Sequence, residues 1–339
     1  MKPIKLTILT LIIATATMLE QENVTFQKPS QEIMQLADFD RAPSVSMNSK
    51  KDWMLLSYRN TYKSLEELNK DELRLGGLRI DPNTNISSTA TFINNLKVKR
   101  VSDKTDTQVK GLPTNALISN LIWSPDETKL AFTNTTASGN ELWIVELQTA
   151  TATKLTDAVL NANLGNPITW YKNGTALLIK VIPASKKALI DAAKAIPNGP
   201  IVSESQEGVV SPNRTYQDLL KNKTDEANFE NIVTSELYTI DLKGTKKLFK
   251  AADLYAGETF SPDGNYILLT TIQKPFSYLV PLSRFPMKTI AYTTEGKEVK
   301  LVNDVALSEV MPKGFMAVRE GKRSMSWRSD KPATLFFVE

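Results

Sequence analysis

The chain has no cysteine and no histidine among its 339 residues. Without cysteine it has no disulfide, no thiolate nucleophile, no thiolate zinc site and no cysteine for lipid attachment. Without histidine it lacks the usual general base of serine hydrolases and the commonest metal ligand. A Ser-His-Asp triad therefore cannot be assembled from this chain alone.

A strong charge of one sign is also missing. The sequence has 41 Lys and Arg against 37 Asp and Glu, so its formal net charge is +4. This small excess, with no long basic run, gives no electrostatic basis for binding nucleic acid. No Asp-x-Asp-x-Asp-Gly loop is present, and we expect neither a metal site nor a cofactor.

The one long apolar run lies at the N-terminus. Lys2 and Lys5 open the chain, and an apolar stretch containing small residues follows from Leu6 to Leu19. This pattern predicts a signal peptide over residues 1–19, since a run of about 14 residues is too short to span a bilayer comfortably. An uncleaved anchor or a buried strand is the alternative. We expect an exported protein, periplasmic or secreted, with an extension at 20–41 and no membrane attachment after signal cleavage.

Five segments of the chain share one pattern, seen most clearly in "IWSPDETKLAF". Each has an apolar residue in second place, then a polar turn, then a short apolar run. Proline in such a turn presets φ, and Asp with Gly or Asn accepts the tight geometry. Five copies in one frame form a repeat. The copies span residues 46–56, 122–132, 169–179, 259–269 and 326–337.

Alternating strands between these copies extend each repeat to about four strands. Residues 141–149 with 152–157, and 235–244 with 245–250, read as such pairs. One four-stranded antiparallel sheet per repeat is a β-propeller blade. The sequence therefore predicts an all-β fold, an incomplete β-propeller of about five to six blades, at residues 42–182 and 234–339. The longer gaps between copies must hold insertions or a degenerate blade.

One insertion is visible in the composition. Residues 184–205 become helical in character and are stopped by Pro197-Asn-Gly-Pro200, and 214–233 form a second helical stretch. We interpret residues 183–233 as a helical insertion between blades.

Four segments carry a family resemblance: "LGGLRIDPNTN" (75–85), "RTYQDLLKN" (214–222), "PFSYLVPLSRFP" (275–286) and "GKRSMSWRSDKPATLFFVE" (321–339). In the order of these segments, the chain resembles the N-terminal, propeller-bearing half of serine peptidases of the prolyl oligopeptidase superfamily, nearest the glutamyl endopeptidase branch. The resemblance implies a peptide substrate and a C-terminal α/β-hydrolase domain that carries Ser, Asp and His.

The chain departs from that family at the catalytic residues. It has no histidine and no Gly-x-Ser-x-Gly nucleophile elbow, so no catalytic residue carries over. We expect a truncated protein that lacks its catalytic domain, is inactive alone, and exposes an aggregation-prone apolar edge near Leu335–Val338. A non-catalytic periplasmic interaction module is the alternative function.

Candidate binding residues are few. An enzyme that cuts after glutamate needs a cation to receive the side-chain carboxylate, and Arg319, Arg323 and the weaker Arg284 are the candidates. The alternative for the first two is a solvated turn with one arginine stacked on Trp327. The repeated tryptophans are expected to pack rather than bind ligands, and the repeated aspartates to accept backbone hydrogen bonds in turns. These are Trp123, Trp170 and Trp327, and Asp126, Asp263 and Asp330.

Overall fold

The computed structural model describes residues 27–191, 194, 215–312 and 316–339. Residues 1–40 and 41–339 form two separate units. The described part of the first contains one short, exposed helix, α2 (Gln31–Ala37). The predicted signal peptide lies outside the described residues. No helix within the described ranges is both long enough and apolar enough to cross a membrane.

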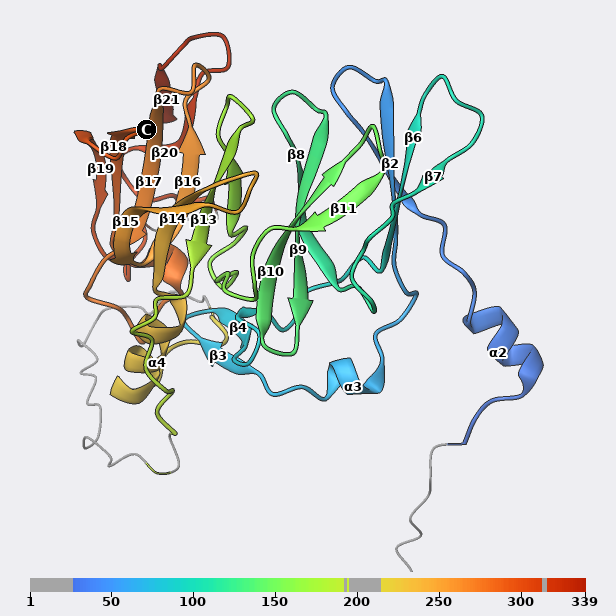
Figure 1. Ribbon diagram of the computed structural model, residues 1–339. Coiled ribbons are helices and arrows are strands. Elements are labelled where there is room, and N and C mark those ends of the chain that lie inside the picture. Colours follow the sequence, from blue (N-terminus) through green and yellow to red (C-terminus); the bar gives the residue numbers. More distant parts are fainter. Residues whose placement is uncertain (1–26, 192–193, 195–214, 313–315) are drawn as a thin grey trace, which may run out of the picture. The chain divides into compact units, whose positions relative to one another are not determined.

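The second unit is built from four antiparallel sheets of four strands and one further hairpin (Figure 1). This confirms the predicted β-propeller. Sheet one contains β1 (Ser44–Met47), β2 (Trp53–Tyr58), β6 (Asn95–Arg100) and β7 (Thr107–Gln108). Sheet two contains β8 (Ile118–Trp123), β9 (Lys129–Thr136), β10 (Gly139–Glu146) and β11 (Thr151–Lys154). Sheet three contains β12 (Ile168–Trp170), β13 (Ala176–Val181), β14 (Ser235–Asp241) and β15 (Lys246–Asp253). Sheet four contains β16 (Tyr255–Phe260), β17 (Tyr266–Ile272), β18 (Met287–Thr293) and β19 (Glu298–Val305), and the hairpin pairs β20 (Arg323–Trp327) with β21 (Leu335–Val338).

The five sequence repeats are the first two strands of these five units. In each copy the first strand, the polar turn and the second strand form one antiparallel hairpin. The longest gaps between copies hold insertions, which lie between the second and third strands of sheets one and three.

The sheets pack face to face in chain order. Leu130 and Phe132 of β9 enter a core shared with sheet one, whereas Ala131 between them enters a core shared with sheet three. In the same way Leu177 of β13 faces sheet two and Leu178 faces sheet four. This alternation follows from the two-residue period of a strand, and it explains why the apolar runs of the repeats are nearly continuous.

One end of the sheets carries the turns between first and second strands. We call it the turn end. Ser124 Oγ donates to Asp126 Oδ1 at 2.6 Å and accepts from the Lys129 N–H at 2.9 Å. The turn at 261–266 repeats both bonds, at 2.5 and 3.0 Å. These hydrogen bonds confirm that the repeated Ser-Pro-Asp sequences are turns.

The opposite end of the sheets carries long connections, and we call it the insertion end (Figure 1). They are residues 59–94, 182–234, 273–286 and 306–322. The first contains α3 (Leu65–Leu68) and a small sheet of β3 (Leu73–Leu75), β4 (Leu78–Asp81) and β5 (Ile86–Ser87). The second contains α4 (Lys223–Val233), and the third the 3-10 helix η1 (Leu282–Arg284).

Three of the segments that carried the family resemblance meet at the insertion end in a satellite core. Phe229 of α4 is fully buried there and packs edge-on against Phe276 and Phe285. Gly77 donates its N–H to the Asp218 carbonyl at 2.8 Å, and a Cβ at Gly77 would lie 2.9 Å from the Pro281 Cβ. The segments 75–85, 214–222 and 275–286 are therefore packed against one another.

The helical insertion differs from its prediction. Residues 184–191 form a turn and an extended segment, not a helix, and the rest of the predicted first helix lies outside the described residues. The second helix is confirmed from Lys223, but residues 215–222 before it are not helical. Side-chain amides of α4 bind the backbone of the extended segment, and these bonds replace the bonds that a helix would make.

A buried ion pair joins sheets three and four. Lys180 Nζ lies 3.2 Å from Glu258 Oε1, with the side chains 3% and 6% exposed. Lys180 also donates to the Leu164 carbonyl at 2.6 Å. Glu258 Oε1 has no well-aligned hydrogen bond, and burial raises the pKa of Glu258 more than Lys180 lowers it. No local sequence pattern indicates this pair, because its residues lie 78 positions apart.

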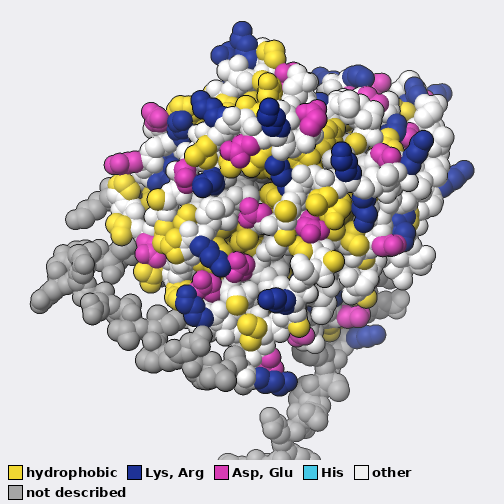
Figure 2. All heavy atoms as spheres, turned by 60° about the vertical axis from the view of Figure 1, so that its left-hand side comes forward, with side chains coloured by type: hydrophobic (Ala, Val, Ile, Leu, Met, Phe, Trp, Pro, Cys, Tyr) yellow, Lys and Arg dark blue, Asp and Glu magenta, His cyan; other side chains and the backbone are white. Residues whose placement is uncertain are grey.

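The surface near sheet four is mixed in character. Figure 2 shows basic and acidic side chains interspersed over that face, with apolar patches between them. Exposed apolar residues on the last hairpin contribute to the surface: Phe336, Phe337 and Val338 are 47%, 42% and 51% exposed.

Candidate functional site

The three candidate arginines line one pocket at the insertion end. Arg284 ends η1, Arg319 lies in the 306–322 connection, and Arg323 begins β20. The pocket has a volume of about 370 Å³. Besides the arginines it is lined by two serines and by apolar side chains: Ser283, Ser308, Phe285, Met287, Val305, Met311, Ala317 and Val318.

The backbone of a turn holds two of these guanidinium groups in place. Arg323 Nη1 donates to the Arg319 carbonyl at 2.8 Å, and Arg319 donates to the carbonyls of Glu320 and Lys322. Gly321 allows this turn because its φ is +81°, a conformation that other residues rarely adopt. The backbone of this one turn therefore positions both guanidinium groups.

The third arginine is held by a different part of the insertion end. The Arg284 guanidinium lies 5.9 Å from the centroid of the Tyr216 ring. The Ser308 N–H donates to the Arg284 carbonyl at 3.0 Å, which ties η1 to the connection that carries Arg319. Nothing in the spacing of residues 216 and 284 indicates this contact, so it could not be predicted from the sequence.

The charge balance of these arginines differs from that of Arg79 and Arg328. Arg79 pairs with Asp218 at 2.8 Å, and Arg328 pairs with Asp330 at 2.6 Å. Among the described residues, none of the three pocket arginines has a carboxylate within ion-pair distance. All three are half-buried. A partly desolvated cluster of guanidinium groups without counter-ions is suited to bind an anion.

One part of the alternative, an arginine stacked on Trp327, is not found among the described contacts, whereas the solvated turn stays a prediction. Trp327 donates its indole N–H to the Thr259 carbonyl at 3.2 Å. Within the described ranges, the arginines that lie over aromatic rings are Arg100 over Trp53 and Arg284 over Tyr216. The stacking on Trp327 was therefore wrong.

The other tryptophans pack as predicted. Trp170 is buried, and Trp123 packs against the core between sheets one and two. Asp263 accepts a hydrogen bond from Ser261, and this bond lowers its pKa below the ordinary value. Asp330 is occupied by Arg328. In the part of the chain that the structure describes, no three acidic side chains are grouped as metal ligands.

Comparison with known proteins found relatives by sequence. The chain is 32% identical over 327 residues to a protein of rice (Oryza sativa subsp. japonica) described as a probable chloroplastic glutamyl endopeptidase, covering 93% of this chain and 34% of that protein. An Arabidopsis thaliana protein of the same description is 32% identical over 344 residues, covering 95% and 35%. The chain thus spans about a third of the length of these relatives. No protein-family model matches the chain.

Solved structures are more distant. Pyrococcus horikoshii acylaminoacyl peptidase gives a TM-score of 0.43 at 15% identity, over 80% of this chain and 33% of that one. The propeller domain of the trilobed protease of Pyrococcus furiosus gives 0.39 at 12%, over 78% and 59%. The sequence similarity and the blade architecture described above confirm the predicted resemblance to the propeller half of serine peptidases of the prolyl oligopeptidase superfamily, nearest the glutamyl endopeptidase branch.

Proposed function

We propose that this chain is the propeller portion of an exported serine endopeptidase, and that it admits and positions peptides while other polypeptide supplies the catalytic triad. The similarity to two glutamyl endopeptidase-like proteins over more than nine-tenths of the chain supports this proposal. The absence of histidine from the sequence supports the division of labour, because acyl transfer through a serine needs a general base.

The arginine pocket gives the propeller a role in specificity. We propose that Arg319, Arg323 and Arg284 receive the side-chain carboxylate of a glutamate in the peptide. A guanidinium can bind a carboxylate with two parallel hydrogen bonds, and partial burial strengthens them. Met287 and Val305 offer apolar surface to the methylene groups of that side chain. The observation that carries this role is the set of three half-buried arginines without carboxylate partners.

Binding of matched peptides tests the proposal. A fluorescent peptide with one glutamate is titrated into the chain, and its affinity is compared with that of the same peptide carrying glutamine. Glutamine has the same shape but no charge, so the glutamate peptide is expected to bind about tenfold more tightly. Arg323→Gln is expected to remove most of this difference. Equal affinities for the two peptides in the unaltered chain would exclude the role in specificity.

Two controls accompany this titration. Arg328→Gln changes an arginine that is already paired with Asp330 and lies outside the pocket, so it should leave the affinity ratio unchanged. The chain alone should release no product from a glutamyl substrate, whereas turnover by the purified chain would contradict the proposed division. If neither peptide binds, the interaction-module alternative is favoured.

Export is tested separately. The chain is produced with residues 1–19 in a Gram-negative host, and the compartments are separated. We expect a processed protein in the periplasm or medium, with an N-terminus near residue 20. Unprocessed protein in the cytoplasm would contradict export.

A further inference from the structure

A second pocket lies at the insertion end of sheet one, where the connection 59–94 leaves β2 and returns to β6 (Figure 1). It has a volume of about 280 Å³, close to the lower end of the roughly 300–1,000 Å³ that is usual for small-molecule sites. Its lining includes three cations, one carboxylate and two amides: Arg41, Arg59, Lys63, Glu67, Asn60 and Asn94.

Backbone pairing of the sheets fixes the walls of this pocket. The Asn94 N–H donates to the Tyr58 carbonyl at 2.8 Å, which brings the two ends of the connection together. Asn94 Nδ2 also donates to Asn60 Oδ1 at 2.6 Å. Ile93 and Ile118 exchange two backbone hydrogen bonds, of 2.9 and 2.8 Å, and so join the connection to sheet two. The pocket is therefore formed by the fold itself.

Arg59, the first residue after β2, is a half-buried cation in this lining. Its Nε is buried and has no hydrogen-bond acceptor within the described ranges. A buried donor without an acceptor is costly, most of all when the group is charged, and folded proteins contain few of them. The Arg59 side chain therefore indicates an acceptor that the described part of the chain does not supply.

The other charged groups of the lining leave this arginine uncompensated. Lys63 Nζ contacts the Ser88 carbonyl at 3.5 Å, a long hydrogen bond. Glu67 accepts from the Ser64 N–H at 2.8 Å, in the capping box that begins α3. Among the described residues, Arg41, Arg59 and Lys63 have no carboxylate within ion-pair distance. Three cations and one carboxylate give the pocket a net charge of +2.

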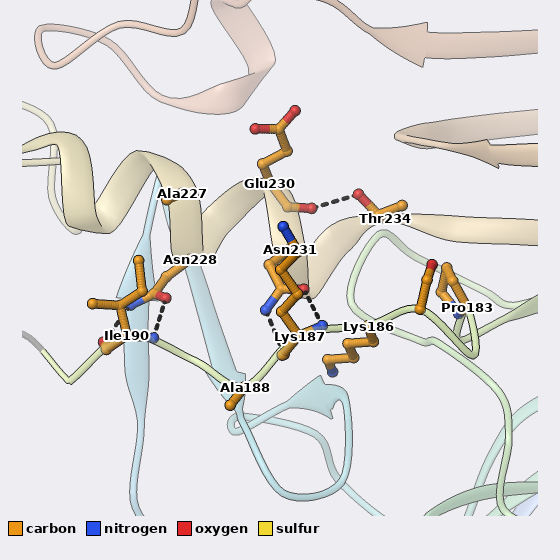
Figure 3. A pocket seen from close by; sticks show the side chains of 11 residues that line it. Pro183, Lys186, Lys187, Ala188, Ile190, Ala227, Asn228, Glu230, Asn231 and Thr234 are labelled. Carbon is orange, nitrogen blue, oxygen red and sulfur yellow. Dashed lines mark hydrogen bonds between the residues drawn. The ribbon is translucent and has the colours of Figure 1, made fainter.

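The pocket beside α4, of about 370 Å³, shows the contrast (Figure 3). Asn231 of α4 accepts from the Lys187 N–H at 3.2 Å and donates to the Lys187 carbonyl at 2.8 Å. Asn228 makes the same two bonds with another residue of the extended segment, at 2.8 and 2.9 Å. Glu230 pairs with Lys274 at 2.8 Å. These side chains of α4 are already paired, whereas Arg59 lacks a partner.

We propose that the pocket at Arg59 binds the phosphate group of a small phosphate monoester. Such a group carries about two negative charges near pH 7, which matches the net charge of the lining. Its three terminal oxygens can accept from Arg59, Lys63 and the Asn60 amide together, whereas a single guanidinium satisfies the two oxygens of a carboxylate. Phe92 and Leu117 offer half-buried apolar surface to the organic substituent. This site is independent of the arginine pocket and of the proposed peptidase role.

Calorimetric titration of the full chain tests the site. Phenyl phosphate is the probe at pH 7.5 and low salt, and benzoate and inorganic phosphate are the matched competitors. Phenyl phosphate is expected to bind at least about tenfold more tightly than benzoate, which has one charge, and more tightly than inorganic phosphate, which has no apolar part. Equal affinity for benzoate would overturn the choice of phosphate, and equal affinity for inorganic phosphate would overturn the choice of a monoester.

Substitutions locate the binding. Arg59→Gln should weaken phenyl phosphate binding at least about tenfold, because it removes a charge-assisted hydrogen bond. Arg100→Gln is the matched control: Arg100 lies on β6 outside the pocket and donates to Gln148 Oε1 at 2.6 Å, so its loss should leave the affinity unchanged. If Arg323→Gln abolishes binding and Arg59→Gln does not, the anion occupies the arginine pocket and the proposal is wrong.

Two further measurements separate binding from folding and define the source of the phosphate. Arg59→Gln breaks no hydrogen bond or ion pair between described residues, so its free energy of unfolding in urea should match that of the unaltered chain; should this variant not fold, Lys63→Gln, expected to weaken binding about threefold, replaces it. A phosphoserine peptide should bind no more tightly than phenyl phosphate. Tighter binding of the peptide would overturn a small molecule in favour of a phosphorylated protein.

Discussion

Both ends of the propeller sheets connect antiparallel strands, but the connections at the two ends differ in length and in the contacts that they make. At the turn end each connection is short, and its polar groups bind one another, as Ser124 and Asp126 do. At the insertion end four connections are long, and their contacts join residues far apart in sequence, such as Arg79 and Asp218. The first arrangement can be repeated from blade to blade, whereas the second occurs once.

The turn end and the insertion end also differ in how their charged side chains are paired. At the turn end Asp126 is satisfied locally: burial raises its pKa, but hydrogen bonds from Ser124 and Thr128 outweigh this and bring the pKa below its ordinary value. At the insertion end Arg284, Arg319 and Arg323 line one pocket and have no carboxylate partner among the described residues. Unsatisfied charge is expensive to keep half-buried, so its concentration at one end indicates where ligands bind. Variants at both ends test this division.

The largest expected effect is at the centre of the satellite core. Phe229→Ala removes a fully buried ring that contacts two other aromatic rings, and should lower the free energy of unfolding by about 3–5 kcal/mol. Urea unfolding measures this change, and hydrogen exchange should quicken in β3 and β4 more than in sheet two. Phe337→Ala is the control, because this ring is 42% exposed, and a change below about 0.5 kcal/mol is expected. Equal losses in the two variants would show that the satellite core adds no stability.

The next effect concerns the buried pair. Lys180→Met leaves Glu258 buried without its cation and should cost about 3 kcal/mol at pH 7. Glu258→Gln should cost less, because burial penalises the carboxylate that it removes and raises the pKa of Glu258, whereas Lys180 keeps the carbonyls of Leu164 and Tyr255 as acceptors. Urea unfolding of both variants at one pH compares them, and a larger loss in Glu258→Gln would contradict the direction of the pKa shift.

The pH dependence of the same pair gives an independent measurement. Because the pKa of Glu258 is raised above 4.5 in the folded protein, the folded state binds a proton more tightly than the unfolded state. Its contribution to stability is therefore complete below pH 4.5 and is lost as the pH rises through the raised value. The difference in free energy of unfolding between the wild-type chain and Glu258→Gln should fall over that range. A difference in the free energy of unfolding that grows with pH would contradict a raised pKa of Glu258 in the folded protein.

Sequence reasoning predicted the turn end well and the insertion end poorly. The Ser-Pro-Asp turns are local, so every residue that determines them lies within six positions of the others, and the repeat revealed them. The satellite core depends on contacts between residues such as Gly76 and Phe285, more than two hundred positions apart, which no local pattern contains. The first predicted helix is a further example. Residues 184–191 have a helical composition, but asparagine side chains from α4 bind their backbone and they do not form a helix.

The candidate arginines illustrate the same limit. Arg319 and Arg323 could be proposed because they lie close together in one basic segment. Only the fold brings Arg284 into the same pocket, because it lies 35 positions before Arg319 in the sequence. Chemistry that depends on a missing counter-ion cannot be seen in a sequence, because a sequence does not show which charges are paired.

A smaller effect is expected at the turn end. Ser261→Ala removes the donor to Asp263 and the acceptor of the Tyr266 N–H, in a side chain with no exposed surface, and should cost about 1–2 kcal/mol. Chemical unfolding measures the loss. Ser329→Ala, at an exposed serine in the turn of the last hairpin, should be nearly neutral. Because this network is local, Ser261→Ala should leave peptide binding at the other end unchanged, and a large fall in affinity would mean that the two ends are coupled.

The smallest expected effect concerns the Tyr216 ring, which lies beside the pocket arginine Arg284. Tyr216 contacts Arg284 through its aromatic face, and such a contact at a partly exposed site contributes about 0.5 kcal/mol. Tyr216→Leu should therefore weaken binding of the glutamate peptide about twofold, while Tyr216→Phe, which keeps the ring, should bind as the unaltered chain does. Fluorescence titration at low salt resolves a change of this size. If Tyr216→Phe and Tyr216→Leu bind the peptide equally well, the ring does not position Arg284. The specificity of the pocket must then rest on Arg319 and Arg323, because backbone carbonyls hold their guanidinium groups in place.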